Sequence, residues 1–145
     1  MKYSLKREYA IIGKYIEKTN PQLVKQIRKD ISCNNNDPEE KDILILKQII
    51  KENPVTDKQF QIYFISSFLK IYQFPALLVK EVCLRPGLRY YLSFYLDVMG
   101  EGISRTVSQV KCYYEHIPQF RQNTDNIVTK YNSLQNNNNN EIKND

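Results

Sequence analysis

The chain has 145 residues, which suits one domain or a compact domain with tails and is long enough to bury a hydrophobic core. Its composition, 41% hydrophobic and 26% charged, is ordinary for a globular protein, and it contains only four glycines and six prolines. No stretch is long and apolar enough to span a membrane, and the N-terminus lacks the apolar core of a signal peptide, so we expect no membrane partner.

The net charge of +5 is concentrated at one end of the chain. Residues 1–30 hold eight Lys or Arg and three acidic residues, whereas residues 75–121 hold six and four. Because phosphate neutralisation supplies most non-specific DNA affinity, the C-terminal half is not expected to bind DNA strongly by itself. The basic N-terminal face is compatible with a nucleic-acid backbone, an acidic partner or simple solvation; its members are Lys2, Lys6, Arg7, Lys14, Lys25, Arg28 and Lys29.

Few residues of the chain suggest a catalytic or metal-binding site. Cys33, Cys83 and Cys112 are odd in number and lack CxxC spacing, which argues against a disulfide scaffold or a zinc site and fits a reducing compartment. We expect Cys33 and Cys83 to be small buried hydrophobes. The single histidine, His116, has no orienting partner or nucleophile arranged near it in sequence. We therefore expect no catalytic site, no metal and no cofactor.

The N-terminal third predicts three amphipathic helices. Apolar residues at helical spacing indicate the first over residues 3–18. Asn20-Pro21 is a helix-start signal, and a second helix follows to about residue 31. Asp37-Pro38-Glu39-Glu40 starts a third, which reaches about residue 52. Residues 1–53 are thus expected to form an N-terminal helical segment.

The rest of the chain also predicts helices. Thr56 with Gln59 is a capping-box pattern, and the apolar helix over 57–72 is expected to be central. Further helices are expected over 75–85, 88–99, 106–117 and 124–134, and the asparagine run at 136–140 is expected to be disordered. The fold class is all-α with six or seven helices, in which residues 54–121 form a helix-turn-helix domain and 122–145 a short helix with a disordered tail.

Residues 88–117 read as a helix, a glycine turn at Gly100-Glu101-Gly102 and a second helix opened by a Thr106/Gln109 capping box. Val107, Val110, Tyr114 and Ile117 would face the core. The opposite side would meet base edges in a DNA groove, and the start of the helix would lie near phosphate. The expected DNA-binding residues are Arg89, Arg105, Thr106, Ser108, Lys111, Cys112 and Arg121.

Ser104-Arg105-Thr106-Val107-Ser108-Gln109-Val110-Lys111, followed by Tyr113-Tyr114, resembles the third helix of Myb/SANT and homeobox-like domains. The tryptophans typical of Myb repeats are absent, and the first helix of such a unit is either 57–72 or 76–85. This resemblance implies a C-terminal trihelical unit that binds DNA or, as in some SANT domains, protein.

The small basic chain, rich in Asn and Lys, is also similar to the accessory subunits of the ciliate DNA N6-adenine methyltransferase complex. In that family other subunits bind S-adenosylmethionine and perform the chemistry. The resemblance implies a nuclear, non-catalytic accessory subunit whose partners are double-stranded DNA and the protein subunits of a larger complex, such as a methyltransferase. The alternative is a SANT-like scaffold that binds protein without binding DNA.

Overall fold

The structure, a computed structural model, describes residues 4–32 and 37–143 and confirms the all-α class. These residues form eight helices and no strand, one helix more than the upper number expected. Within this part of the chain, none of the helices has the length and apolar character needed to cross a membrane. The chain divides into two compact units, Met1–Asn34 and Asn35–Asp145, which are described separately.

The first unit consists of α1 (Leu5–Thr19) and α2 (Pro21–Ser32), which pack against each other. One residue joins them. The Asn20 backbone N–H donates to the Ile16 carbonyl at 2.7 Å and closes α1, while its side-chain oxygen accepts from the Leu23 N–H at 3.1 Å and opens α2. The expected start signal at Asn20-Pro21 is therefore confirmed.

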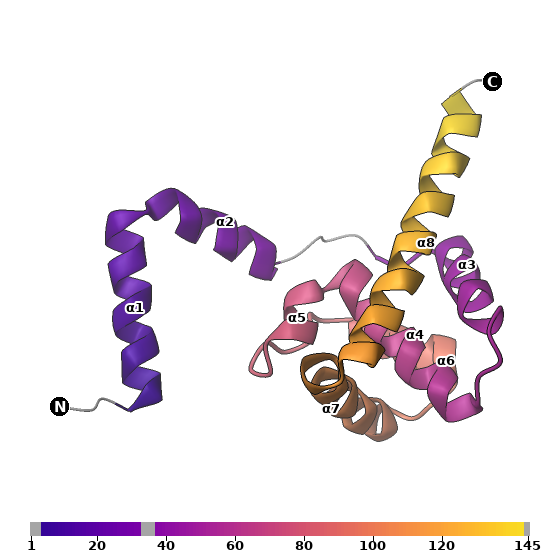
Figure 1. Ribbon diagram of the computed structural model, residues 1–145, viewed down its shortest axis with the longest axis horizontal. Coiled ribbons are helices and arrows are strands. Elements are labelled where there is room, and N and C mark those ends of the chain that lie inside the picture. Colours follow the sequence, from indigo (N-terminus) through magenta and orange to yellow (C-terminus); the bar gives the residue numbers. More distant parts are fainter. Residues whose placement is uncertain (1–3, 33–36, 144–145) are drawn as a thin grey trace. The chain divides into compact units, whose positions relative to one another are not determined.

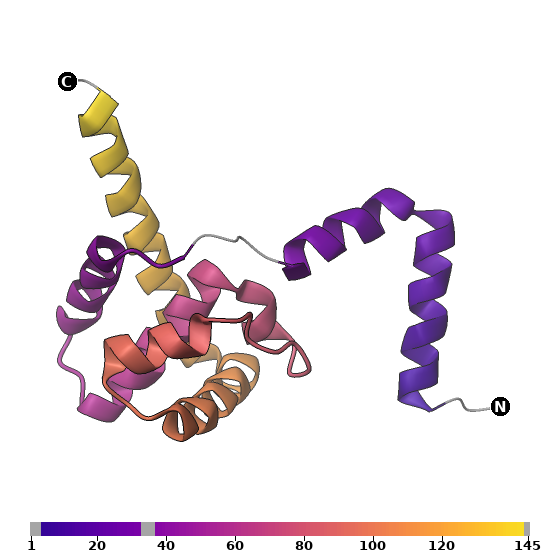
Figure 2. The same ribbon diagram turned by 180° about the vertical axis from the view of Figure 1, so that it is seen from behind.

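The second unit is organised around α4 (Asp57–Tyr72), as Figures 1 and 2 show. Six consecutive residues, 64–69, are buried, so the middle of α4 is covered on every side. The helices that pack directly against it are α3 (Glu40–Lys51), α5 (Phe74–Leu78), α7 (Gly100–His116) and α8 (Pro118–Lys143), while α6 (Leu88–Leu96) packs against α7. The prediction of a central helix is confirmed.

Local sequence signals explain where α4 starts and which side chains pack along it. The Thr56 hydroxyl accepts from the Gln59 N–H at 3.2 Å, and the Gln59 side chain accepts from the Thr56 N–H at 3.0 Å, which completes the expected capping box. Along the helix the rings of Phe60, Phe64, Phe68 and Tyr72 follow one another with centroids 4.8–6.1 Å apart. This aromatic row fills the space between α4 and its neighbours.

Both ends of the second unit extend beyond the expected boundaries. The helix α3, placed by sequence in the N-terminal segment 1–53, buries four apolar residues in the same core as α4: Ile43, Leu46, Ile49 and Ile50. The helix α8 begins at Pro118 rather than 124 and continues through the asparagine run, which was expected to be disordered. Its first half packs on α3, α4 and α7, and its exposed second half extends away from them (Figure 1).

The helix expected over 75–85 is wrong beyond Leu78. Val79 is extended, and residues 79–87 form an irregular loop held by tertiary hydrogen bonds. The buried Gln73 side chain donates to the Cys83 carbonyl at 2.9 Å and accepts from the Arg85 N–H at 2.8 Å. Cys83 itself is exposed, against expectation, and Cys33 lies outside the described residues.

Because α4 is the centre of the core, we expect Phe68→Ala to lower the free energy of unfolding of the full chain by about 3–5 kcal/mol, the usual cost of a large cavity. Phe94→Ala is the matched control, since its ring is 66% exposed, and we expect a change below about 1 kcal/mol. Urea unfolding followed by circular dichroism measures both. Equal losses for the two variants would contradict the central position of α4.

Candidate binding surface

The turn between α6 and α7 differs from the glycine turn expected from sequence. The chain turns at Asp97, whose backbone adopts the left-handed conformation with φ of 53°, and α7 then starts at Gly100. Gly102 lies in the first turn of α7, where a Cβ atom would come within 2.9 Å of Val98 Cγ1. This glycine is needed for close packing rather than for a positive φ.

The expected capping box at Thr106 and Gln109 is also wrong, because both residues lie inside α7. The Thr106 hydroxyl donates to the Gly102 carbonyl at 2.9 Å, and the Gln109 amide donates to the Tyr113 hydroxyl at 2.6 Å. The helix α7 thus starts at Gly100, six residues earlier than the predicted start at Thr106. Glycine is a poor helix former but can adopt helical backbone angles, and tertiary contacts favour the helix here. The expected core-facing residues Val107, Val110 and Tyr114 are buried, but Ile117 is exposed.

Two cations expected to contact DNA instead bind backbone carbonyls of the same unit. Lys111 Nζ donates to the carbonyls of Val82 and Lys80 at 2.9 and 3.2 Å and so fastens the 79–87 loop to α7. Burial lowers the pKa of Lys111. Arg121 donates to the carbonyls of Tyr114 and Glu115 at 2.8 and 2.6 Å, where the last turn of α7 lacks helical partners. These side chains stabilise the fold at α7.

A third cation, Arg89 on α6, donates to the Ser104 hydroxyl and so joins α6 to α7. The hydroxyl of Ser108 donates back to the Ser104 carbonyl at 3.2 Å, although the residue itself is exposed. Of the seven expected DNA-binding residues, Arg105, Ser108 and Cys112 share the exposed side of α7. Hydrogen bonds within the unit engage five of the seven: Arg89, Thr106, Ser108, Lys111 and Arg121.

The exposed side of α7 is not basic. Its residues recur at spacings of three and four and are Glu101, Arg105, Ser108, Cys112 and Glu115. One cation therefore stands between two carboxylates. Residues 35–145 as a whole hold thirteen basic and thirteen acidic residues, so the second unit carries no net charge. A neutral unit has little electrostatic attraction for a phosphate backbone.

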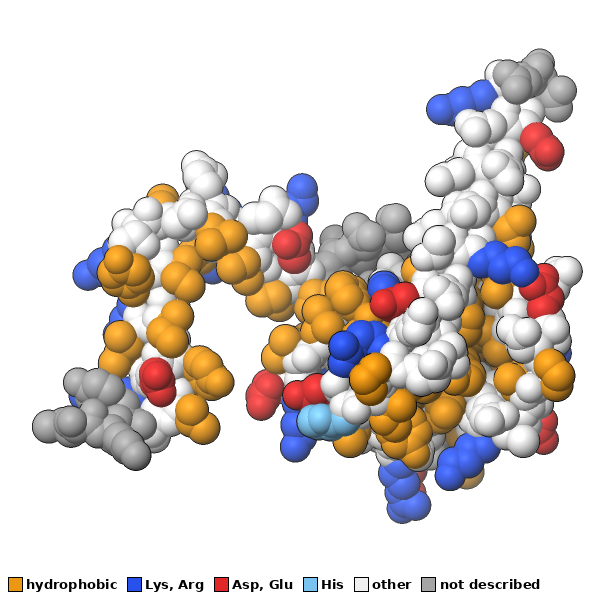
Figure 3. Space-filling view, in the orientation of Figure 1, with side chains coloured by type: hydrophobic (Ala, Val, Ile, Leu, Met, Phe, Trp, Pro, Cys, Tyr) orange, Lys and Arg blue, Asp and Glu red, His pale blue; other side chains and the backbone are white. Residues whose placement is uncertain are grey.

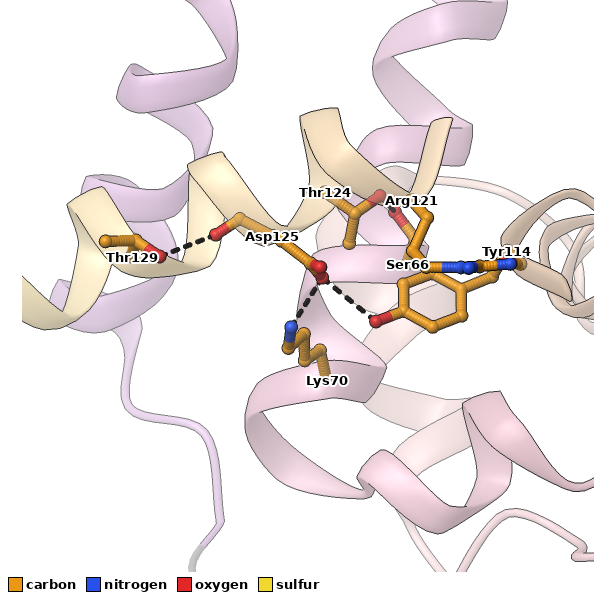
Figure 4. Close-up of polar contacts among 7 residues, drawn as sticks. All are labelled: Ser66, Lys70, Tyr114, Arg121, Thr124, Asp125 and Thr129. Carbon is orange, nitrogen blue, oxygen red and sulfur yellow. Dashed lines mark hydrogen bonds and ion pairs between the residues drawn. The ribbon is translucent and has the colours of Figure 1, made fainter. Parts of the chain in front are cut away.

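Behind this surface, a polar cluster joins three helices (Figure 4). Asp125 on α8 accepts from Lys70 of α4 at 2.5 Å and from the Tyr114 hydroxyl of α7 at 2.9 Å. Burial, together with the hydrogen bond to Asp125, raises the pKa of Tyr114 to about 12. Beside the cluster, the hydroxyls of Ser66 and Thr124 share a buried hydrogen bond of 2.9 Å. These contacts fix α7 against α4 and α8, so the outer surface rests on a rigid base.

An aromatic surface on α6 was not among the expected sites. Tyr90 and Phe94, one helical turn apart, are 67% and 66% exposed, and their rings stack with centroids 6.2 Å apart. Half-buried Tyr91 and Tyr95 stack behind them at 6.3 Å. Met99, in the turn that follows, is 85% exposed. The spacing of Tyr90 and Phe94 places them on one face of a helix. The sequence alone does not tell which face of α6 points outwards.

The described residues 4–32 and 37–143 contain no group of three or more His, Cys, Asp or Glu side chains placed to hold a metal ion. Comparisons with models of protein families, with curated proteins and with solved structures found no match to this chain.

Because Lys111 fastens the 79–87 loop, we expect Lys111→Ala to lower the free energy of unfolding by about 1–3 kcal/mol, the cost of leaving the partly buried Val82 carbonyl unpaired. Arg105→Ala is the matched control on the exposed side of the same helix, with an expected change within about 0.5 kcal/mol. Chemical denaturation of both full-length variants measures the difference. An unchanged stability for Lys111→Ala would mean that its side chain is available to bind a ligand.

Proposed function

We propose that this chain is a non-catalytic accessory subunit that binds protein partners within a larger complex, as the scaffold interpretation of its sequence implies. The observation that carries the proposal is the aromatic surface of α6, defined by Tyr90, Phe94 and Met99. Exposed aromatic and methionine side chains gathered on one helix are typical of interaction sites, because these residue types are enriched at protein interfaces and bury a large apolar area against a partner.

The position of this surface supports the proposal. The buried side chains of Leu88 and Leu92 and the Arg89–Ser104 hydrogen bond hold α6 on the unit. The helix α7 is in turn fixed through Asp125 to α4 and α8. A rigid aromatic surface loses little conformational entropy on binding. The neutral charge of residues 35–145 also favours a protein partner over DNA, because association needs no phosphate neutralisation.

The proposal can be tested with the tagged full chain expressed in its own cells. We expect Tyr90→Ser combined with Phe94→Ser to reduce recovery of co-purifying subunits by about tenfold or more, since the loss of two anchoring aromatics costs about 2 kcal/mol or more. Quantitative mass spectrometry of the isolated complexes provides the measurement.

Ile142→Ser is the control, because Ile142 is an exposed apolar residue on the second half of α8, which extends away from the other helices (Figure 1). The complexes should survive high salt, as expected for an apolar interface. Subunit recovery that is the same for the aromatic variant and the control would sink the proposal.

DNA binding by an accessory subunit of a nuclear complex, such as a DNA adenine methyltransferase complex, is the second candidate. One observation favours it: residues 1–30 hold a net charge of +5, and Lys14, Lys18 and Lys25 are exposed. Clustered cations on a helix face are the usual electrostatic basis of contact with a phosphate backbone. In this version the DNA contact moves from α7 to α1 and α2.

For this second candidate we expect the full chain to bind labelled duplex DNA in a salt-sensitive manner, and we expect Lys18→Ala with Lys25→Ala to weaken binding and reduce the salt dependence. Fluorescence anisotropy at two salt concentrations gives both quantities. Arg105→Ala reports on the exposed side of α7 in the same assay. Absence of binding at low salt would exclude the candidate, and an effect of Arg105→Ala alone would return the contact to α7.

A further inference from the structure

The first unit has an apolar face that nothing within the unit covers. No described side chain of α1 or α2 is buried. Leu5 and Tyr9 on α1 are more than two-thirds exposed, and Ile12, Leu23 and Ile27 are between 40% and 46% exposed. Figure 3 shows hydrophobic side chains gathered along the inner side of the bend between the two helices. Helices of 15 and 12 residues are marginal in water without such a face being buried.

The inner side of the bend contains a groove. Its floor is apolar and consists of Ala10, Gly13, Ile16, Val24 and Ile27, and its rim carries Lys14, Arg28 and Glu17. Glu17 is engaged by Arg28 at 3.4 Å in an exposed ion pair. The rim is therefore basic on balance, within a unit whose first 30 residues have eight cations and three carboxylates.

Gly13 has no packing reason within the unit. It lies in the middle of α1, where glycine costs about 1 kcal/mol relative to alanine. A Cβ atom at this position would meet nothing within 4 Å, so the contact of α1 with α2 does not require glycine. The missing side chain instead leaves the groove floor open to the close approach of another backbone.

We propose that the groove between α1 and α2 binds an amphipathic helix of a partner protein that presents acidic residues beside its apolar stripe. The apolar floor takes the stripe, as in other helix-in-groove complexes, and the cationic rim and surroundings attract the carboxylates. A bend that is apolar on its inside fits a convex helix better than a flat bilayer. The charge of +5 opposes pairing with a second copy. This site is separate from the α6 surface and does not rest on it.

The probe is a synthetic amphipathic peptide of about 18 residues with a leucine stripe flanked by glutamates, and its counterpart has lysines in place of the glutamates. Fluorescence anisotropy with the full-length protein gives the affinities. Hydrogen exchange with mass spectrometry locates the bound segment. We expect the acidic peptide to bind more tightly than the basic one and to protect amides within residues 5–32.

Two substitutions test the groove itself. Gly13→Leu favours the helix but fills the groove, and Lys14→Glu reverses a charge on its rim. We expect each to weaken binding of the acidic peptide by about tenfold. Gly100→Leu and Lys58→Glu are matched controls on the second unit, because Gly100 also has nothing within 4 Å of an added Cβ and Lys58 is exposed. Both controls should bind like the wild type.

Several outcomes would overturn the proposal. They are equal affinity for the two peptides, protection outside residues 5–32, or the same affinity for Gly13→Leu and wild type.

Binding to phosphatidylserine vesicles without binding to the acidic peptide would assign the face to a membrane surface. A concentration-dependent dimer lost in Gly13→Leu, seen by sedimentation, would assign it to a second copy. The peptide results do not depend on Phe94, so Tyr90→Ser with Phe94→Ser separates this site from the proposed α6 surface.

Discussion

The burial of the middle of α4 on all sides is the constraint on which the second unit depends. Over residues 64–69 the helix exposes no polar face to water, so its neighbours must supply both apolar contacts and partners for the polar side chains of this stretch. The Ser66–Thr124 and Lys70–Asp125 contacts meet part of that need from α8. Asp125 also accepts from Tyr114, so the same carboxylate that pairs with α4 sets the position of α7.

That arrangement determines what the cations of the second unit can do. Five of the seven expected DNA-binding residues make hydrogen bonds within the unit. Lys111 binds carbonyls of the 79–87 loop, and Arg121 binds carbonyls at the end of α7. Freeing such a side chain to contact DNA would cost the hydrogen bond that it makes within the unit. Helical spacing alone predicts that Lys111 faces DNA, and the structure shows in addition that its side chain binds carbonyls of the 79–87 loop.

The sequence predicted those features that depend on neighbouring residues and missed those that depend on distant ones. The Asn20 cap, the Thr56–Gln59 capping box and the centrality of α4 follow from local spacing and hydrophobicity. The end of α5 depends on Gln73 and Lys111 binding a loop, and the start of α7 depends on Gly102 packing against Val98. The outward direction of Tyr90 and Phe94 is likewise set by which side of α6 meets α7.

The two units use their charge and hydrophobicity in opposite ways. Residues 35–145 balance thirteen cations with thirteen carboxylates and bury a complete core, leaving the α6 aromatics as a compact exposed cluster. The first unit carries the whole net charge of the chain, and none of its described side chains is fully buried, although its apolar residues are as regular as those of a core helix. Two helices with that pattern need a further apolar contact to be stable, because the contact between them alone does not offset the entropy of ordering them. An acidic helical partner would satisfy both properties at once, since it supplies the missing core and neutralises the charge.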